Sequence, residues 1–480
     1  MSRKLLLASG GAALLCAALF MYLTADDPSR YVVFSTWGTP SEIAGFQALI
    51  DHFNATRHPL HPVKLSHSEQ YQYTERLLVK SAALASPDVI HLDRKDLPLF
   101  VRKGLLEDLT PFEERDSSFD AGAFLPPLPA GCLVGGRTFA VPHNFSTLVL
   151  YYNRDHFDAA GLTYPDSTWT WDTLLAAARR LTVRDRDGNV VRYGCHMQIA
   201  FSVLLEQNGG HVLNDALDSC VISSTECAEA LQFEVDLSEK YHVSWSMLAQ
   251  NLQWDDMFAG GRLSMIANGR WAAVQYERAL GGGSVDVAPL PRGKLRRGAA
   301  TGHVMAISSA SGKKEEAWEF IRYLVSDEGE RIENSGGASI PAVRSVASSD
   351  EFLHHELTPG MNNRVFIDEL PSSVVWPFAQ GPYLTTFTLQ SRFELAVRRV
   401  LLHEATAVQS LRIMQDEING EIRTQRTHTA ARPFAGSVLS WLCAALCAAA
   451  FFLAWRLFRK RGSRAPAAAP PVEPQARVPR

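Results

Sequence analysis

The chain has 480 residues, of which 46% are hydrophobic and 20% charged, and its formal net charge is −4. The first 23 residues carry two positive charges, and residues 434–480 carry seven positive and one negative, which leaves −12 for the part between them. This acidic central part argues against nucleic acid and anionic surfaces as partners. Its roughly 400 residues exceed a single hydrophobic core and predict two lobes.

The N-terminal end carries an apolar segment that predicts export or membrane insertion. Residues 5–23 are apolar or small and uncharged, a longer run than the ~7–15 residues of a secretory h-region. Residues 1–26 are therefore predicted to be a signal peptide cleaved after Ala25, or an N-terminal signal anchor. A lipid-modified Cys16 is disfavoured, because the preceding Leu15 is not a small residue.

A second apolar stretch, residues 434–456, is long enough to span a bilayer as a helix. Basic residues follow it, and positive flanks stay in the cytoplasm. We therefore expect the protein in the cell inner membrane, with its central part facing the periplasm or the cell exterior. Residues 419–433 would form a short tether, and residues 457–480 a disordered basic tail in the cytoplasm.

The first elements of the central part alternate between strand and helix. Apolar runs at 31–36, 63–67 and 88–92 predict strands, and 41–54 and 71–84 have the apolar spacing of helices. This β-α-β-α-β order predicts a mostly parallel sheet in an α/β fold. Further predicted strands cover 148–152, 263–267, 285–290 and 303–308, and predicted helices cover 171–182, 198–208, 225–240, 313–325 and most of 383–421.

The stretch from residue 258 to 276 places an indole at the end of a strand. Two glycines end a helix, residues 263–267 form a buried strand, and Asn268 is an N-cap for the next helix. Trp271 then falls in the first helical turn, beyond the carboxyl end of a strand, where ligands bind in open α/β sheets. The alternative is that Trp271 is a core residue, because tryptophan is highly buried on average.

Four cysteines lie between the apolar end segments, namely Cys132, Cys195, Cys220 and Cys227. An oxidising periplasm allows disulfides, and Cys220–Cys227 is the pairing that we expect first. Buried free thiols are an equally good interpretation. The sequence contains no CxxC motif and no paired-histidine spacing, so we expect no metal site and no cofactor.

Several segments in order carry a resemblance to a known family. They are PDVIHLD (87–93), GLLEDLTPF (104–112), AVPHN (140–144), LYYNR (150–154), TWDTL (170–174), 258–271 and KEEAWEFIRYL (314–324). Their order and spacing resemble those of the family 1 extracellular solute-binding proteins, the maltose-binding-protein-like carbohydrate binders of bacterial ABC importers. The resemblance implies a two-lobed periplasmic-binding-protein fold of type II, whose hinge closes around a sugar.

The resemblance also implies lobe boundaries and a ligand site. Lobe 1 would comprise residues 30–142 and 301–340, and lobe 2 residues 143–300 and 341–430, with crossing strands near 141–147, 294–302 and 340–344. The positions that match ligand contacts are Trp37, Ser41, Glu42, Asp93, Asn144, Trp271, His303 and Trp376. Each has a structural alternative: Trp37 and Trp376 as core residues, Glu42 as a favourable charge at a helix N-terminus, and Asp93 as a helix cap.

The family implies a monomeric ectodomain that captures a carbohydrate and delivers it to a separate ABC permease. The C-terminal membrane segment departs from the family pattern and leaves a second hypothesis open, a sensor or scaffold that signals to a membrane partner. Glycan hydrolysis would require Glu42 and Asp93 to stand roughly 5–9 Å apart across a substrate. No GxSxG or HExxH motif occurs, so we do not expect an enzyme.

Overall fold

The computed structural model describes residues 28–68, 73–83, 85–197, 201–246, 248, 253–375 and 383–430. Contacts divide the chain into one unit that ends at Ile422 and a second that runs from Arg423 to Arg480. The predicted membrane segments 1–26 and 434–456, and the predicted tail 457–480, lie outside the described residues. Within the described ranges, no helix is both long enough and apolar enough to cross a membrane.

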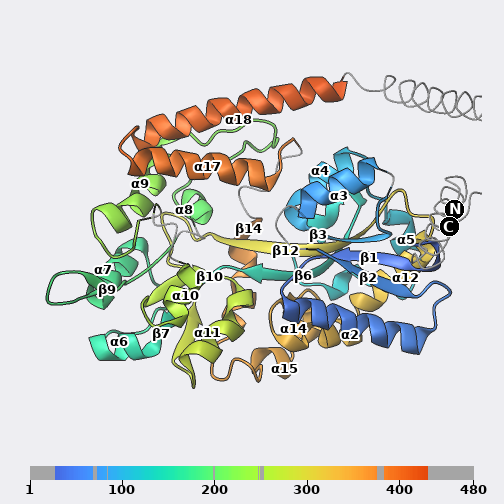
Figure 1. The fold of residues 1–480 in the computed structure, drawn as a ribbon, viewed down its shortest axis with the longest axis horizontal. Coiled ribbons are helices and arrows are strands. Elements are labelled where there is room, and N and C mark those ends of the chain that lie inside the picture. The colour runs from blue at the N-terminus through green and yellow to red at the C-terminus, as the bar shows by residue number, and fades with distance from the viewer. Residues whose placement is uncertain are drawn as a thin grey trace, which may run out of the picture. The chain divides into compact units, whose positions relative to one another are not determined.

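The largest sheet of the described residues has seven strands (Figure 1). Its order is β13-β6-β12-β3-β1-β2, with β14 beside β12. The strands are β1 (Val32–Thr36), β2 (Val63–His67), β3 (Val89–Asp93), β6 (Val141–Thr147), β12 (Gly298–Ile307), β13 (Ile340–Pro341) and β14 (Ser373–Val375). β1 pairs in parallel with β2 and β3, as predicted, whereas β12 is antiparallel to both β3 and β6. The sheet is therefore mixed and not mostly parallel, because β12 enters it in the opposite direction.

Helices cover both faces of this sheet. Helix α2 (Pro40–Arg57) lies on one face, and α3 (Tyr73–Ala82) and α4 (Leu97–Arg102) lie on the other (Figure 1). α2 begins with a capping box, in which Thr39 and Glu42 each accept a hydrogen bond from the other's backbone N–H. A cap of this kind stabilises a helix by about 1 kcal/mol, which explains why α2 starts at this point.

Three antiparallel strands form a smaller sheet in the order β10-β7-β11. They are β7 (Val149–Asn153), β10 (Met265–Asn268) and β11 (Val285–Ala288). Only Leu148 separates β6 of the large sheet from β7 of the small one, so the chain passes directly from one sheet into the other. This passage lies at the first of the predicted crossings.

The remaining described helices and hairpins surround the two sheets. They are α5 (Thr110–Arg115), α6 (Arg154–Ala160), α7 (Trp171–Leu181), α8 (Phe201–Gln207), α9 (Thr225–Glu239), α10 (Trp254–Ala259), α11 (Ala273–Leu280), α12 (Lys314–Leu324), α13 (Asp327–Glu333), α14 (Arg344–Ala347), α15 (Asp350–Leu353), α16 (Arg364–Asp368), and the strand pairs β4 (Leu133–Val134) with β5 (Arg137–Thr138) and β8 (Val183–Arg184) with β9 (Val190–Arg192). Of these elements, α7, α8, α9 and α12 correspond to the helices predicted over 171–182, 198–208, 225–240 and 313–325.

Two long helices follow in the chain, α17 (Thr386–Leu401) and α18 (Ala407–Ala430). Leu389 of α17 and Leu411 of α18 belong to one apolar core with residues of α8 and α9. The tether predicted over 419–433 is helical as far as Ala430. This segment can continue the helix because neither glycine nor proline occurs between Gly420 and Pro433.

The four described cysteines are buried free thiols, so the expected Cys220–Cys227 disulfide is wrong. The thiol of Cys227 lies 3.7 Å from the carbonyl oxygen of His211, and the backbone N–H of Cys220 donates to Asn419 Oδ1. Both residues belong to the same apolar core, but each has its own polar partner and the two sulfur atoms are not bonded. Burial raises the pKa of each thiol to about 11, so neither ionises near neutral pH.

Candidate functional site

Three of the predicted polar residues lie side by side on neighbouring strands of the large sheet. Asp93 ends β3, Asn144 lies in β6, and His303 lies in β12 between them. In the strand register, His303 pairs with Asp93 on one side and with Asn144 on the other. A sequence alone places these residues in separate segments, and the antiparallel return of β12 brings them together.

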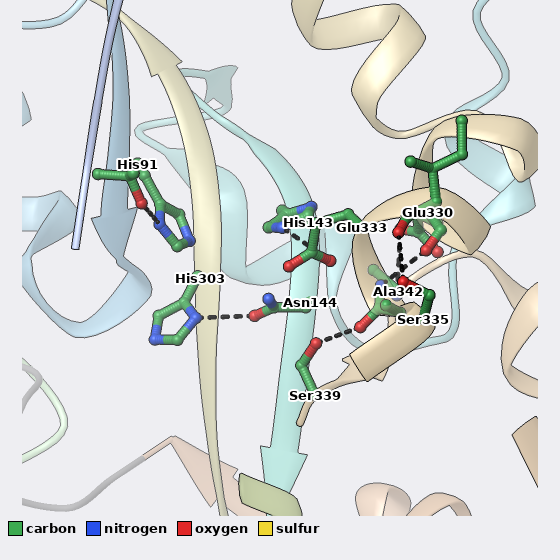
Figure 2. A network of polar contacts seen from close by, with 12 residues as sticks. His91, His143, Asn144, His303, Glu330, Glu333, Ser335, Ser339 and Ala342 are labelled. Atoms are coloured by element: carbon green, nitrogen blue, oxygen red, sulfur yellow. Dashed lines mark hydrogen bonds and ion pairs between the residues drawn. The ribbon is translucent and has the colours of Figure 1, made fainter. Parts of the chain in front are cut away.

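The hydrogen bond between His303 and Asn144 fixes the tautomer of the imidazole (Figure 2). His303 Nδ1 lies 2.8 Å from Asn144 Oδ1, and an amide oxygen is only an acceptor, so Nδ1 carries the proton. Burial lowers the pKa of His303, although the carboxylates of Asp93 and Glu42 oppose this shift. The ring is therefore neutral near pH 7, and its Nε2 has a lone pair that accepts a hydrogen bond.

Trp37 is an aromatic wall of this group and is mainly a core residue. Its side chain is 6% exposed. The indole stacks on His91 with ring centroids 4.6 Å apart, and it meets His303 edge-on at 5.1 Å. Trp37 is therefore mostly a core residue, as its structural alternative states. Its ring also contacts the imidazole of His303.

The carboxylates of Glu42 and Asp93 both serve as caps. Glu42 Oε2 accepts the backbone N–H of Thr39 at 2.7 Å. Asp93 accepts the backbone N–H of Lys95 at 3.1 Å and forms an ion pair with the Lys95 ammonium at 2.9 Å. The structural alternatives are thus confirmed: Glu42 is an acid in the first turn of a helix, and Asp93 is a helix cap. An ionised carboxylate offers about four lone-pair sites, so each group retains capacity to accept a ligand hydroxyl.

Trp271 lies at the end of β10, on the small sheet, in the short 3₁₀ helix Arg270–Ala272. Its indole is 38% exposed, so the interpretation as a core residue is wrong. The ring packs over Gly269: a Cβ added there would lie 2.1–2.5 Å from three ring atoms. Only glycine leaves room for an indole at this position.

Two predicted residues have no described side chain. Ser41 lies in the first turn of α2, but its side chain lies outside the description. Trp376 lies among the residues that the structure does not describe. The predicted set therefore divides into a group around His303 on the large sheet, Trp271 on the small sheet, and these two positions.

Sequence reasoning missed a histidine cluster behind the site, formed by His91, His143 and His303. His91 has its ring centroid 4.8 Å from that of His303 and 5.5 Å from that of His143, and its Nδ1 lies 2.7 Å from Thr36 Oγ1. His91 interrupts the apolar part of β3, and His143 lies in a strand that is buried throughout. This interruption was the available signal, because a polar side chain in a buried strand requires a partner.

Buried acids adjoin the histidine cluster (Figure 2). His143 Nε2 lies 3.7 Å from Glu333 Oε2, and both side chains are buried. Burial lowers the pKa of His143 to about 3 and raises that of Glu333 to about 8, so both groups are neutral near pH 7. Glu330, one turn earlier in α13, accepts the backbone N–H groups of Ala342 at 3.2 Å and Val343 at 3.0 Å. Glu330 therefore holds the segment that follows β13.

Two surface cavities lie away from these residues. One of about 420 Å³ is lined by α2 and α12 residues such as Phe53 and Tyr323, and one of about 560 Å³ by residues between Leu353 and Arg364. None of the predicted ligand contacts lines either cavity. In the part of the chain that is described, no group of His, Cys, Asp or Glu side chains has the arrangement of a metal site.

The family model for the bacterial extracellular solute-binding proteins matches residues 37–331. The chain belongs to this family. The maltodextrin-binding protein MdxE of Bacillus subtilis is 24% identical to it over 306 residues, which cover 62% of this chain and 70% of that protein. A maltooligosaccharide ABC transporter solute-binding lipoprotein of Streptococcus pneumoniae is 23% identical over 235 residues, which cover 46% and 53%.

Solved structures of ABC substrate-binding proteins share the fold. One from Listeria monocytogenes, in complex with cycloalternan, has a TM-score of 0.71 and 22% identity over 81% of this chain and 98% of that one. One from Thermotoga lettingae, bound with α-D-tagatose, has a TM-score of 0.70 and 22% identity over 82% and 100%. This solute-binding protein therefore has their mixed α/β fold.

Proposed function

We propose that this solute-binding protein captures a carbohydrate outside the cytoplasm and delivers it to an ABC-type permease. The observation that carries the proposal is the alignment of Asp93, His303 and Asn144 on three neighbouring strands. Their free acceptors are carboxylate oxygens and the Nε2 lone pair of a neutral imidazole. Sugar hydroxyls are hydrogen-bond donors, and the named relatives bind maltodextrin and maltooligosaccharide.

The proposed ligand lies between the His303 group and Trp271. Lobe 1 (30–142 and 301–340) supplies Trp37, Glu42, Asp93 and His303, and lobe 2 (143–300 and 341–430) supplies Trp271, whose exposed indole face stacks on the apolar face of a sugar ring. Ser41, Asn144 and Trp376 complete the proposed set. Closure of the hinge at β6 and β13 encloses the ligand, as in two-lobed binding proteins.

Charge makes the proposed site selective for uncharged carbohydrates. Glu42 and Asp93 are acidic, Lys95 forms an ion pair with Asp93, Arg94 also lies within charge range of Asp93, and His303 is neutral. An added phosphate would face the carboxylates of Glu42 and Asp93, while the described cation closest to them, Lys95, is already paired. We expect a neutral sugar to bind at least ten times more tightly than its phosphate ester, measured by calorimetry on the same preparation. Equal affinities would contradict the assignment of Glu42 and Asp93 to the site.

The membrane anchor is part of the proposal. Residues 434–456 would form the transmembrane helix, with residues 457–480 in the cytoplasm and a monomeric binding domain at the periplasmic or outer side. Residues 1–26 would serve as the signal peptide or signal anchor. The support is the uncharged stretch with its basic flank.

The first test is the melting temperature of the purified full chain in detergent, across neutral mono- and oligosaccharides, polyols, sugar phosphates, amino acids and peptides. A ligand at 100 times its Kd stabilises the fold by about 2.7 kcal/mol. A shift with neutral carbohydrates only is the expected result. A shift with amino acids or peptides alone would contradict the carbohydrate assignment, and no shift at all would favour the sensor or scaffold hypothesis.

Delivery requires a separate test in cells. Deletion of the gene that encodes this chain should abolish uptake of the radiolabelled carbohydrate that shifts the melting temperature. Expression of the full chain should restore the uptake. A variant truncated after residue 430 lacks the proposed anchor and serves as the matched control. Normal uptake in the deletion strain would contradict the importer role while leaving the binding result intact.

A further inference from the structure

Arg270, the residue before Trp271, is the largest fully buried side chain in the described part of the chain. It is 0% exposed, whereas the adjacent indole of Trp271 is 38% exposed. Arginine is almost never fully buried without a paired acid. Among the described residues Arg270 forms no ion pair, and no Asp or Glu contributes to the shift of its pKa.

Arg270 remains a cation in these surroundings. Burial lowers its pKa to about 10, which still leaves the guanidinium charged at pH 7. Its carbon Cζ lies 5.8 Å from the ring centroid of Phe352 and 5.7 Å from that of Phe366. Aromatic faces attract a desolvated cation, and a planar guanidinium suits two rings better than an ammonium does.

Polar contacts fix Arg270 at both its backbone and its side chain. Its backbone N–H donates to Ser146 Oγ of β6 at 2.8 Å. Its Nη2 donates to Thr358 Oγ1 at 3.3 Å. These partners come from two separate segments: Ser146 lies in strand β6 of the large sheet, and Thr358 lies in the loop between α15 and α16. The residue that immediately precedes the indole is thus held from two directions.

From these contacts we propose that Arg270 is a positioning residue for Trp271 and thereby a determinant of ligand affinity. Gly269 leaves the space that the indole covers, and Arg270 holds the backbone from which the indole projects. An exposed tryptophan loses side-chain and backbone freedom when it stacks on a ligand, and prior restraint of its backbone lowers this cost. This inference rests on the proposed function, because it takes Trp271 to contact the ligand.

A double-mutant cycle tests the coupling between the two residues. Arg270→Met keeps the length and removes the charge, and we expect it to weaken carbohydrate binding about tenfold. In a Trp271→Ala background the same change should have no further effect, because its target is absent. Arg278→Met, an exposed arginine on α11, is the matched control and should leave affinity unchanged. Equal losses in both backgrounds, or no loss in a folded variant, would overturn the proposal.

Thr358→Val provides a milder variant if Arg270→Met does not fold. It removes the acceptor of Nη2 and keeps the volume, and a loss of about threefold is expected, again only when Trp271 is present. Arg270→Lys keeps the charge but not the planar fork, and it should fall between wild type and Arg270→Met. A lysine variant weaker than the methionine variant would show that charge is not what holds the residue.

A ligand-free measurement separates failure of this inference from failure of the proposed function. Quenching of tryptophan fluorescence by acrylamide is measured in the protein and in its Trp271→Phe variant. The difference between the two gives the quenching of Trp271 alone. Arg270→Met should increase the quenching of this component, and Arg278→Met should not. Increased quenching in a protein that binds no carbohydrate would support the positioning role and refute the ligand assignment. Unchanged quenching would refute the positioning role directly.

Discussion

In the histidine cluster, His91 and His143 are buried and His303 is half-buried among aromatic rings, and desolvation lowers the pKa of each imidazole so that all three are neutral. At the end of β10 in the small sheet, burial is as complete, but Arg270 keeps its charge. The difference lies in the chemistry of the side chains. A buried imidazole becomes neutral by losing a proton, and a buried carboxylate becomes neutral by gaining one, so neither has to carry a charge away from water. A guanidinium stays charged and therefore requires aromatic and hydroxyl partners in one geometry.

The two regions also differ in what they present to a ligand. The cluster presents polar atoms from rigid, mutually paired strands, so its geometry is set by backbone hydrogen bonds. The Trp271 element presents an apolar ring from a single 3₁₀ turn, which depends on side-chain contacts to stay in place. Mutations in the first region should therefore change stability and pH dependence, and mutations in the second should change affinity.

The largest expected effect tests the neutrality of the cluster. Glu333→Gln mimics the protonated acid, and the advantage of the variant over wild type should grow by about 4 kcal/mol between pH 5 and pH 9. The folded pKa of Glu333 is raised to about 8 from 4.5, so the stability it contributes is complete below pH 4.5 and is lost as the pH rises through 8. Urea unfolding at several pH values measures this.

The control for Glu333→Gln is Glu328→Gln, which alters an exposed acid paired with His52 and Arg57 at the surface. It should show no comparable gain at high pH. A loss of stability in Glu333→Gln at pH 7 would show instead that Glu333 and His143 form a charged pair.

The next effect concerns affinity. Trp271→Ala should weaken carbohydrate binding at least tenfold, or about 1.4 kcal/mol, because a stacking face is lost. The melting temperature should change little, since the ring is partly exposed. Trp271→Phe keeps a smaller ring and should lose less. Calorimetry on both variants checks this, and unchanged affinity in a folded Trp271→Ala protein would remove Trp271 from the site.

A smaller effect compares two members of the cluster. His303→Phe keeps the edge-on contact with Trp37 but removes Nε2, and it should weaken binding about fivefold, equivalent to one hydrogen bond of about 1 kcal/mol. His91→Phe removes the contact with Thr36 behind the site and should lower the melting temperature with little change in affinity. The reverse pattern would place the ligand against His91.

The smallest effect is the pH dependence of binding. Burial lowers the pKa of His303 below the ordinary 6.5, so its Nε2 remains an acceptor as the pH falls from 8 through 6.5. Affinity should be constant over this range and decline only at lower pH, where the ring takes up a proton. The acid decline should be absent from His303→Phe. A decline centred on pH 6.5 or above would contradict a buried neutral imidazole.

Local signals predicted the first half of the large sheet well. The apolar spacing of α2 and the alternation of strand and helix are both visible in short segments of sequence. The antiparallel placement of β12 between β3 and β6 is not, because it depends on pairing between residues about 150–210 positions apart, and sequence periodicity carries no information on such partners.

The candidate site shows the same limit. Asp93, Asn144 and His303 were each predicted, on the family resemblance, but their register and the tautomer of His303 follow only from the pairing of β12. His91, His143 and Glu333 were missed because each lies alone in its own segment. Arg270 was missed because a lone arginine at a strand end is ordinarily a solvated charge, and its burial depends on Phe352 and Phe366, far along the chain.

Helix α18 ends at Ala430, and the stretch proposed to span the bilayer begins at Phe434. The three residues between them reach at most about 10 Å when fully extended. If the stretch from Phe434 spans the bilayer as proposed, so short a connection would restrict the search for a permease to lateral diffusion in the membrane and would exclude a search through the volume outside it. The supply of solute to the importer would then depend on the density of both proteins in the lipid plane and would be insensitive to dilution of the surrounding fluid.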